Sequence, residues 1–224
     1  FFNARYHKIY RGYFIMQDIE VDILKEPFPH LILYNFYNHK ELKLIWEELN
    51  FYTKKDKLFE AKDYGGIPER TNSKALWLDQ VYSDKYRSLS NILTVNRKMF
   101  DKVVLNLFSD IHDCCSIAKD CNFDVTKVRY YHNGDVYEPH TDRMIQFLGF
   151  SYFYREPKKF EGGELIFPKY DYTFDCPNNS LIMMPGWVEH GVSKISIKNS
   201  DYFDGYGRYA VTSFFSNKDK KETE

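Results

Sequence analysis

The sequence predicts an α+β fold that is mainly β, in which N-terminal helices support an antiparallel sandwich or jelly roll. Three observations lead to this prediction. Amphipathic helical patterns lie before residue 120, short strand-like runs recur after residue 125, and aromatic residues make up 18% of the chain. Aromatic side chains favour strands and large apolar cores, so the second half is expected to carry most of the β-structure.

We expect a single domain over residues 1–224, because this length suits one large domain and no linker-like stretch divides it. Within it, residues 1–120 are assigned to helical support and N-terminal strands. Residues 121–216 form the β core, and the charged residues 217–224 form a frayed tail.

The N-terminal elements follow from local patterns. Residues 13–15 predict a short strand, and the apolar run 31–37 predicts a longer one. Residues 39–50 alternate apolar and charged positions as an amphipathic helix does. Residues 53–75 are charged and interrupted by glycine, which indicates either a solvated loop or a lid or substrate wall. Residues 84–119 predict helical structure, because apolar residues recur every three or four positions without Gly or Pro.

The second half predicts short strands separated by turn residues. The Asn133-Gly134 pair is a strong signal for a tight turn between the first two of them. The predicted strands are residues 125–131, 135–140, 145–154, 164–167, 181–184, 191–197 and 208–215.

Charge and cysteine content limit the classes of function. Lys plus Arg number 31 and Asp plus Glu number 32, so no overall field attracts nucleic acid or a membrane surface. We find no membrane-spanning apolar run and no secretory signal in these residues. The four cysteines include an adjacent pair, Cys114 and Cys115, and show no disulfide framework. An intracellular, cytoplasmic location is therefore expected.

Candidate metal ligands stand in the stretch from residue 130 to 143. Residues two apart on a strand share a face, so His140 and Asp142 would project an imidazole and a carboxylate into one space. Such a pair is two thirds of a 2-His-1-carboxylate iron site. The missing histidine is expected on a distant strand, where His190 fits, and His132 is interpreted as a bystander.

Arg208 is the only arginine in an otherwise apolar predicted strand. A buried arginine needs a carboxylate partner, and the carboxylate of a bound ligand would satisfy it with two hydrogen bonds. The alternative is that Arg208 marks an exposed strand start and pairs with Asp201 or Asp204.

Together and in this order, the motifs resemble the iron(II)/2-oxoglutarate-dependent dioxygenases, and within them the prolyl 4-hydroxylase-like branch. The resemblance covers roughly residues 125–215, with a weaker echo at 27–49. The motifs that carry it are Tyr131 nine residues before His140, the Tyr-Glu-Pro-His ending at His140, the Gly-Gly-Glu-Leu-Ile-Phe-Pro of residues 162–168 and the Arg-Tyr-Ala-Val-Thr of residues 208–212.

The resemblance implies a double-stranded β-helix that binds iron(II) near one mouth. Three protein ligands would leave positions for 2-oxoglutarate and for dioxygen, and ascorbate is a candidate reductant. The implied iron ligands are His140, Asp142 and His190, and the implied co-substrate contacts are Arg208, Tyr131, Thr212, Tyr152 and Leu165.

Two of these assignments stay open at the level of sequence. Tyr130 replaces Tyr131 if the strand register slips by one residue. Lys194 competes with Arg208 as the carboxylate clamp, because 18 residues separate His190 from Arg208, about twice the spacing expected for the family. The extra segment, residues 198–207, is either a surface insertion or a lid with glycine hinges.

The resemblance also implies hydroxylation of an unactivated C–H bond, with release of succinate and CO2. A prolyl residue in a peptide or protein is the expected substrate, with Arg70, Trp77 and Tyr206 close to it. A free amino acid or another small molecule is the alternative substrate. A different class of function, a catalytically silent jelly-roll binding module, is the alternative to an enzyme. Neither a nucleic-acid nor a membrane partner is expected.

Overall fold

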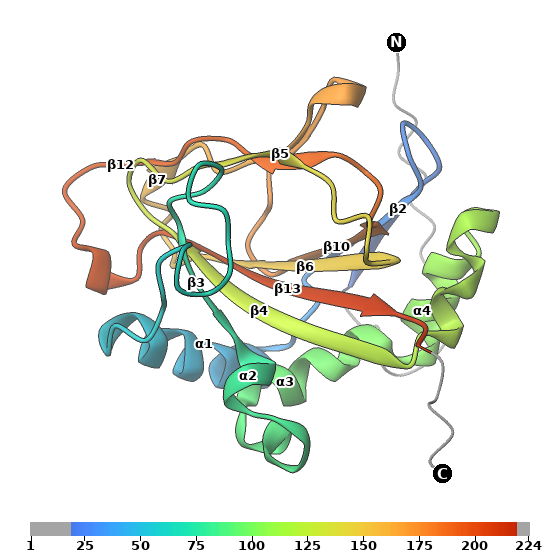
Figure 1. The fold of residues 1–224 in the computed structure, drawn as a ribbon, viewed down its shortest axis with the longest axis horizontal. Coiled ribbons are helices and arrows are strands. Elements are labelled where there is room, and N and C mark those ends of the chain that lie inside the picture. Colours follow the sequence, from blue (N-terminus) through green and yellow to red (C-terminus); the bar gives the residue numbers. More distant parts are fainter. Residues whose placement is uncertain (1–18, 219–224) are drawn as a thin grey trace.

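The fold consists of two antiparallel β-sheets that face each other, with helices on the outer face of the larger sheet (Figure 1). The computed structural model describes residues 19–218. The strand predicted at 13–15 and residues 219–224 of the predicted tail lie outside the described residues.

The large sheet has seven strands and the small sheet has four. In spatial order, the large sheet is β1 (Glu20–Leu24), β2 (His30–Tyr34), β10 (Ser180–Pro185), β6 (Phe147–Phe153), β13 (Arg208–Ser216), β4 (Phe123–Tyr131) and β3 (Lys74–Trp77). The small sheet is β5 (Tyr137–His140), β11 (His190–Val192), β8 (Leu165–Phe167) and β9 (Tyr172–Phe174). A further pair is formed by β7 (Phe160–Glu161) and β12 (Ser196–Ile197).

All seven strands predicted after residue 125 are present, with shifted ends. The strand predicted at 191–197 is divided into β11 and β12. The strand predicted from residue 135 begins at Tyr137, because the Asn-Gly turn reaches further: the backbone N–H of Asp135 donates to the carbonyl of His132 at 3.1 Å. The N-terminal part also contributes to the large sheet, since β2 pairs with β10 and β3 pairs with β4.

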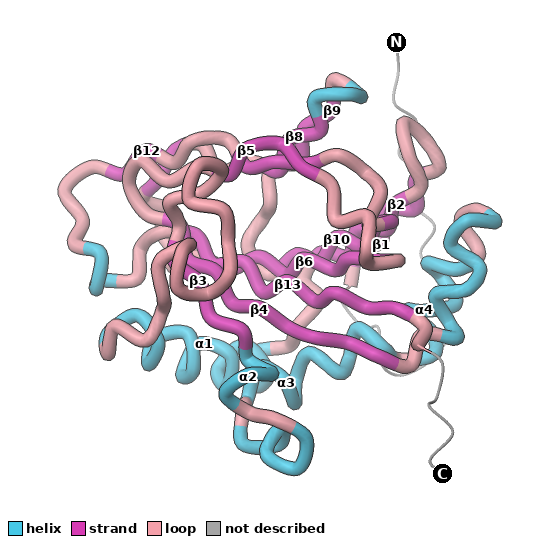
Figure 2. Tube along the Cα trace, viewed as in Figure 1, coloured by secondary structure: helices cyan, strands magenta, loops and turns pink. Residues whose placement is uncertain are grey.

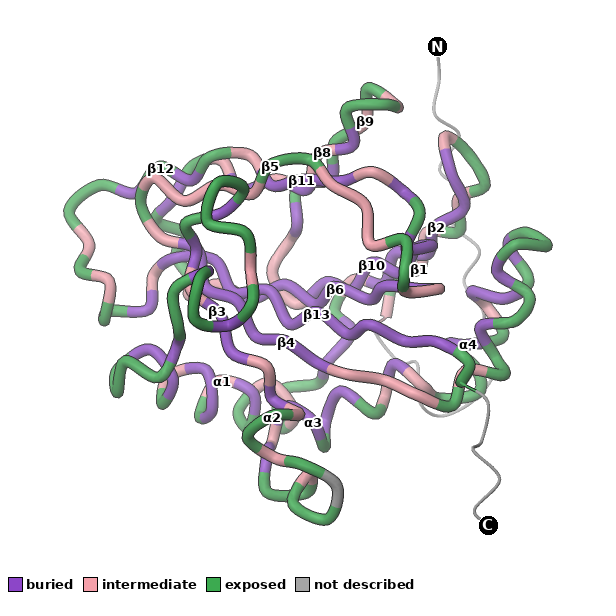
Figure 3. Tube along the Cα trace, in the orientation of Figure 1, coloured by how far each residue is buried: buried purple, intermediate pink, exposed green. Residues whose placement is uncertain are grey.

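The central strands of the large sheet are buried on both faces, as Figure 3 shows for β6, β10 and β13, and β4 is buried from Thr126 to Tyr131. Their side chains alternate between two apolar cores. Leu31 and Leu33 of β2 pack with the helices, while Ile32 packs between the sheets. In β13, Val211 packs on the helix side and Ala210 packs on the side of the small sheet. One face of the sheet therefore belongs to the helices and the other to the space between the sheets.

The helices α1, α2 and α3 lie on the side of the large sheet opposite β5, β7 and β12 (Figure 1). The helical segments are α1 (His39–Lys54), α2 (Leu78–Val81), η1 (Asp84–Leu89), α3 (Asn91–Asn96), η2 (Arg97–Phe100), α4 (Lys102–Ser109), η3 (Asp113–Asp120), η4 (Pro168–Tyr170) and η5 (Tyr202–Asp204), where η denotes a 3-10 helix. Asn38 starts α1 through a capping box with Glu41. The helix continues to Lys54, beyond the predicted end at residue 50, because Tyr52 and Thr53 are buried on its inner face.

The helical region predicted over 84–119 is divided into short segments with different axes. Polar side chains cap the start of new helical segments here, although no Gly or Pro interrupts the region. The hydroxyl of Ser90 accepts a hydrogen bond from the N–H of Leu93, and Nδ1 of His112 accepts one from the N–H of Cys114. Such caps compete with helix continuation, so the apolar periodicity alone overstated the length of the helix.

The long loop between α1 and β3, drawn among the loops in Figure 2, is bonded to the stretch that contains β5. The N–H of Glu138 donates to the carbonyl of Arg70 at 2.8 Å, and Thr71 bridges Tyr137. The N–H of Val136 donates to the side chain of Asn72 at 3.0 Å. These bonds make residues 70–73 a side wall next to β5. None of residues 53–75 is among the residues that line the cavity described below, so the interpretation of this loop as a lid or substrate wall stays a prediction.

All four cysteines carry free thiols. Among the helices of residues 19–218, none combines the length and the apolar character needed to cross a membrane.

Candidate functional site

A cavity lies between the two sheets and holds about 440 Å³ of empty space, its open mouth included. Strands β4, β6 and β13 of the large sheet contribute to its lining, as do β5, β8 and β11. All eight residues predicted to hold iron or co-substrate are among the lining residues. The complete lining is Lys127, Arg129, Tyr131, Tyr137, His140, Asp142, Phe150, Tyr152, Leu165, His190, Val192, Arg208, Ala210, Thr212 and Phe214.

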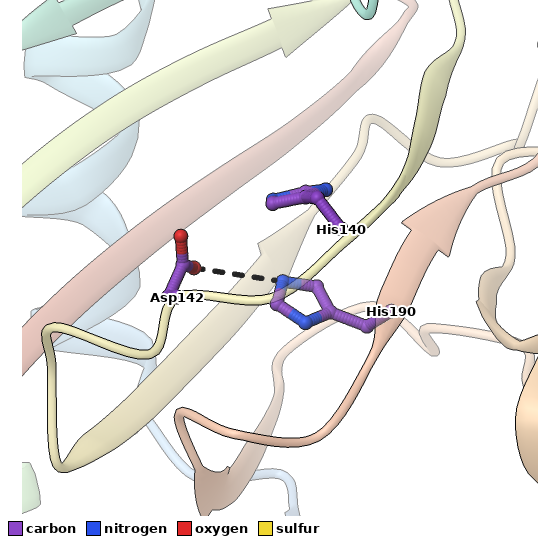
Figure 4. A group of neighbouring side chains, drawn as sticks. All are labelled: His140, Asp142 and His190. Atoms are coloured by element: carbon purple, nitrogen blue, oxygen red, sulfur yellow. Dashed lines mark ion pairs between the residues drawn. The ribbon is translucent and has the colours of Figure 1, made fainter.

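The predicted iron ligands converge at this cavity (Figure 4). His140 and His190 are cross-strand partners of β5 and β11, which places their rings 4.6 Å apart between centroids. Nε2 of His190 lies 3.7 Å from Oδ2 of Asp142, and one ligand atom from each of the three residues lies within 4.8 Å of the others. Two imidazoles and one carboxylate at this spacing are the donor set of a facial iron(II) site.

Asp142 does not lie on the strand, contrary to the sequence-based argument. Strand β5 ends at His140, and Asp142 lies in the following loop. Its backbone N–H donates to the carbonyl of Gly186 at 3.0 Å, and its carbonyl accepts from the N–H of Ile145 at 2.9 Å. The bond to Gly186, in the turn before β11, and the bond within the loop bring the carboxylate back to the two histidines. The alternation of strand side chains was therefore the wrong reason for a correct proximity.

Both histidines are oriented by backbone carbonyls. Nδ1 of His140 lies 2.9 Å from the carbonyl oxygen of Glu138, and Nδ1 of His190 lies 2.9 Å from that of Val188. A donating Nδ1–H leaves the lone pair on Nε2, and in His190 this is the nitrogen that faces the carboxylate of Asp142. These hydrogen bonds fix the orientation of each imidazole ring and the tautomer that a metal ion would need.

The electrostatics of the site keep the imidazoles neutral. Burial, together with the neighbouring His190, lowers the pKa of His140 to about 4. Burial also lowers the pKa of His190, against the opposing effect of Asp142. Neutral imidazoles at neutral pH are ready to bind a cation without first losing a proton.

Arg208 lies in the cavity wall with 1% of its surface exposed. Its Nη1 donates to the thiol sulfur of Cys176 at 3.2 Å, while Nε and Nη2 have no hydrogen-bond partner in the described part of the chain. The guanidinium lies over the rings of Tyr131 and Tyr152, at 4.6 and 5.0 Å from their centroids. A buried guanidinium with two unused nitrogens fits a ligand carboxylate. The predicted alternative, an exposed strand start paired with Asp201 or Asp204, is wrong.

The Gly162-Gly163 pair of the sequence motif lies directly beside this arginine. Both glycines have positive φ angles, 76° and 78°. A Cβ on Gly162 would lie 2.0 Å from the carbonyl oxygen of Lys194, and one on Gly163 would lie 2.8 Å from the side chain of Ile195. The motif therefore permits a close backbone approach at the wall that carries Arg208.

The two alternatives that the sequence left open are separated by position. Tyr131 lines the cavity, whereas the hydroxyl of Tyr130 donates to the carbonyl of Tyr202 on the opposite face of β4. Lys194 is exposed, and Arg208 is buried in the lining. The interpretation of His132 as a bystander agrees with its position, because its ring packs near Tyr130 on that opposite face.

The three residues expected near the substrate lie outside the cavity lining of the described chain. Arg70 is exposed and contributes only its carbonyl to the side wall. Trp77 packs against Phe214 and donates from Nε1 to the carbonyl of Tyr64 at 3.0 Å. Tyr206 packs against the amino group of Lys159. None of the three side chains therefore lines the cavity, although Trp77 and Tyr206 pack against the apolar core between the sheets.

The segment 198–207 does not cover the cavity in the described structure, because its 3-10 helix η5 packs toward α1. Asp201 caps η5, and Tyr202 packs edge-on against Tyr130. Gly207 is needed for close packing, since a Cβ there would lie 2.1 Å from the carbonyl oxygen of Tyr131. This position explains the long spacing between His190 and Arg208 as an excursion to the helix side.

Two cationic residues of the lining, Lys127 and Arg129, were not predicted. They precede Tyr131 on β4 by four and two residues, so all three share the cavity face. The signal was present in the sequence as two charged residues at inward positions of a predicted strand. It was missed because their direction depends on the register that assigns Tyr131 rather than Tyr130 to the cavity.

Comparison with known proteins gives matches in structure alone. No protein-family model matches the sequence, and no curated protein sequence matches it. A Pseudomonas putida prolyl-4-hydroxylase superposes with a TM-score of 0.52 at 13% identity, covering 85% of this chain and 93% of that one. A Trichoplax adhaerens prolyl hydroxylase, solved with a peptide fragment of the hypoxia-inducible factor oxygen degradation domain, gives a TM-score of 0.55 at 12% identity, covering 84% and 83%.

A Burkholderia pseudomallei oxidoreductase of the 2OG-Fe(II) oxygenase family gives a TM-score of 0.53 at 13% identity and covers 84% of each chain. The chain therefore has the fold of the prolyl hydroxylases and related 2OG-Fe(II) oxygenases. At this level of identity the likeness concerns the fold, and it confirms the resemblance at that level.

Proposed function

We propose that the protein is an iron(II)- and 2-oxoglutarate-dependent dioxygenase that hydroxylates an unactivated C–H bond. The observation that carries the proposal is the shared cavity: His140, Asp142 and His190 converge there, and the unsatisfied guanidinium of Arg208 lines the same space. A carboxylate clamp beside a three-ligand metal site suits a co-substrate that chelates iron at one end and carries a carboxylate at the other.

The residues present fit both groups. The Nε2 atoms of the two histidines and the carboxylate of Asp142 would hold the iron, and Arg208 would hold the C5 carboxylate of 2-oxoglutarate. Around the co-substrate, the implied contacts of Tyr131, Thr212, Tyr152 and Leu165 all lie in the lining. Bound iron would supply the activation of dioxygen, and the protein supplies orientation of the C–H bond and exclusion of water.

The overall reaction balances without a further oxidant. Dioxygen provides one oxygen atom to succinate and one to the hydroxyl of the product, while 2-oxoglutarate loses CO2. Ascorbate would serve as the reductant that keeps the iron ferrous. We further interpret the two facing sheets as a double-stranded β-helix and the whole chain as one catalytic domain.

A prolyl residue of a peptide or protein is the first candidate substrate. The likeness in fold to prolyl hydroxylases, one of them solved with a bound peptide fragment, supports this assignment. A free amino acid or another small carboxylic acid is the second candidate, because the cations Lys127 and Arg129 line the cavity as well. A silent binding module is disfavoured by the complete donor set with oriented imidazoles.

The test is succinate formation from 2-oxoglutarate by the protein loaded with iron(II), in air and with ascorbate. We expect slow succinate formation without substrate, faster formation with a true substrate, and a product heavier by one oxygen atom. His140→Ala is the control that should remove both rates. A properly metallated sample that forms no succinate, with or without peptides and amino acids, would contradict the proposed function.

A further inference from the structure

Lys127 and Arg129 give the cavity an excess of positive charge. With Arg208 they make three cationic side chains, and Asp142 is the one carboxylate among the described lining residues. Arg129 is 3% exposed and Lys127 is 9% exposed, so neither charge is solvated by bulk water. None of the three cations forms an ion pair with a carboxylate of the described chain. Buried cations without anionic partners cost folding free energy, which indicates that a ligand supplies the anion.

One end of the Arg129 guanidinium is held by the loop between α1 and β3. Its Nη1 donates to the hydroxyl of Tyr64 at 2.6 Å and to that of Ser73 at 2.8 Å. The ring of Tyr137 lies 4.7 Å from the guanidinium carbon. These contacts fix the plane of the group and leave Nη2, which is buried and has no hydrogen-bond partner in the described part of the chain. The arginine is thus oriented in advance with donor capacity to spare.

Lys127 stands next to it on the same face of β4. Its amino group lies 4.3 Å from the ring centroid of Trp77 and 4.9 Å from that of Phe214, and it has no hydrogen-bond partner among residues 19–218. Burial, together with the nearby charge of Arg129, lowers the pKa of Lys127 well below its ordinary value, against the smaller opposing effect of Asp142. An anion close to both groups would offset this cost.

A count of the formal charges in the cavity indicates which group Arg129 and Lys127 would bind. The charges of a ferrous ion and of Arg208 are balanced by Asp142 and a 2-oxoglutarate dianion. Arg129 then remains without a counter-charge in the same cavity, and Lys127 adds a second basic group beside it. Resting on the proposed function, we propose that the substrate carries a carboxylate that docks on Arg129, with Lys127 as the adjacent second cation.

A carboxylate suits this position because it is flat and presents two oxygens to the donors that the planar guanidinium has left. Two sources provide that group: the free carboxylate of a small acid such as an amino acid, or an acidic side chain next to the reacting residue of a peptide. An internal prolyl residue flanked by neutral residues offers neither. The cation pair thus narrows the substrate class beyond hydroxylation of proline.

The test compares acids with their amides on the wild-type protein. Free amino acids and their carboxamides form one set of probes, and short proline-containing peptides with Glu or with Gln beside the proline form the other. Binding is measured by calorimetry on protein saturated with manganese(II) and 2-oxoglutarate, where no turnover occurs. We expect the best acid to bind about 10- to 100-fold more tightly than its amide, as hydrogen bonds to charged groups imply.

Either set of probes can supply that preference. Tighter binding of free acids identifies a small-molecule substrate, and tighter binding of Glu peptides identifies a peptide with an acidic neighbour. Both results support the carboxylate. A panel in which no acid binds more tightly than its amide overturns the proposal.

Two variants test whether Arg129 is responsible for the preference for acids over amides. Arg129→Gln should reduce the preference for acids to about the level of amides and leave the affinity for 2-oxoglutarate within about threefold. Lys119→Gln, which removes an exposed positive charge on η3, is the matched control and should change neither. If Arg129→Gln weakens 2-oxoglutarate instead, Arg129 binds the co-substrate and the proposal is wrong.

The comparison on wild-type protein remains decisive if Arg129→Gln does not fold. Failure of the proposed function would give a different result. In that case the wild-type protein would bind neither iron nor 2-oxoglutarate and would form no succinate. Failure of the present inference leaves both of these intact and removes only the preference for acids.

Discussion

Two buried polar side chains on opposite faces of the large sheet, Asn96 and Arg208, differ in how many of their hydrogen-bonding atoms have a partner. On the helix face, the hydroxyl of Tyr37 donates to the side-chain oxygen of Asn96 at 2.8 Å, and the amide of Asn96 donates to the hydroxyl of Ser213 at 2.6 Å. On the cavity face of the same strand β13, Arg208 keeps two nitrogens without a partner in the described chain. The polar groups of Tyr37, Asn96 and Ser213 on the helix face are thus satisfied inside the protein.

This difference separates residues kept for stability from residues kept for ligands. A satisfied buried network contributes to folding and specifies the packing. Buried cations without anionic partners, and buried imidazoles that are held neutral, reduce stability, and they are found where a ligand completes them. The helix face and the cavity face should therefore respond differently to substitution.

The largest expected effect is the loss of the metal. His190→Ala removes one of three ligands, so the affinity for iron(II) should fall by more than about 100-fold, since even the loss of an outer hydrogen-bond partner costs 10- to 100-fold. Turnover should disappear with the metal. Equilibrium dialysis of iron(II) measures the affinity, and a retained melting temperature of the metal-free protein would show that the fold is intact. An unchanged iron affinity would remove His190 from the site.

Arg208→Met sharpens the comparison from the cavity side. The affinity for 2-oxoglutarate should fall by about 30-fold or more, because a buried charge-assisted contact is lost. The unfolding free energy of the ligand-free protein should stay the same or rise, because an unsatisfied buried cation is removed. Calorimetry and chemical denaturation measure the two quantities. Lys194→Met is the matched control, and a stronger effect there would transfer the clamp to Lys194.

Asn96→Ala tests the helix face with the opposite expectation. The hydroxyls of Tyr37 and Ser213 would lose a partner in a buried place, so the unfolding free energy should fall by about 1–3 kcal/mol. The affinity for 2-oxoglutarate of the folded protein should not change. Asn106→Ala at an exposed position of α4 is the control, with an expected change within about 0.5 kcal/mol. A loss of 2-oxoglutarate binding without a loss of stability would break the distinction between the faces.

The last prediction concerns the pH dependence of the unfolding free energy. The pKa of His140 is lowered to about 4 in the folded protein, so the unfolded state binds the proton more tightly. The corresponding stability is present above the unfolded value near 6.5 and is lost as the pH falls toward 4. Between pH 7.5 and pH 5 the metal-free protein should lose about 2 kcal/mol of unfolding free energy from this group. His140→Gln should show a smaller loss over the same range, and an equal loss would assign the effect to other groups.

Much of the proposed metal and co-substrate half of the site was readable in the sequence, because the residues that converge there belong to motifs with fixed spacing. His140, His190 and Arg208 lie on strand residues whose direction follows from the strand itself. Asp142 was placed correctly for the wrong reason, since a tertiary hydrogen bond to Gly186 and not strand alternation directs it.

The substrate half could not be read in the same way. The path of the loop before β3 is set by distant contacts, such as the bond between Arg129 and Tyr64, and not by its local sequence. Arg70 and Trp77 were therefore expected beside the substrate, while the cations that line the cavity were missed. The break of the predicted helix at Ser90 has a similar origin, because a side-chain cap outweighed apolar periodicity.

The central claim is that the protein catalyses the oxidative decarboxylation of 2-oxoglutarate to succinate by dioxygen. The most direct test is the mass of succinate formed under ¹⁸O₂ by the iron-loaded protein. The account predicts one labelled oxygen in each succinate from the wild type and no labelled succinate from His190→Ala. Unlabelled succinate from the wild type, or equal labelling in both proteins, would contradict it.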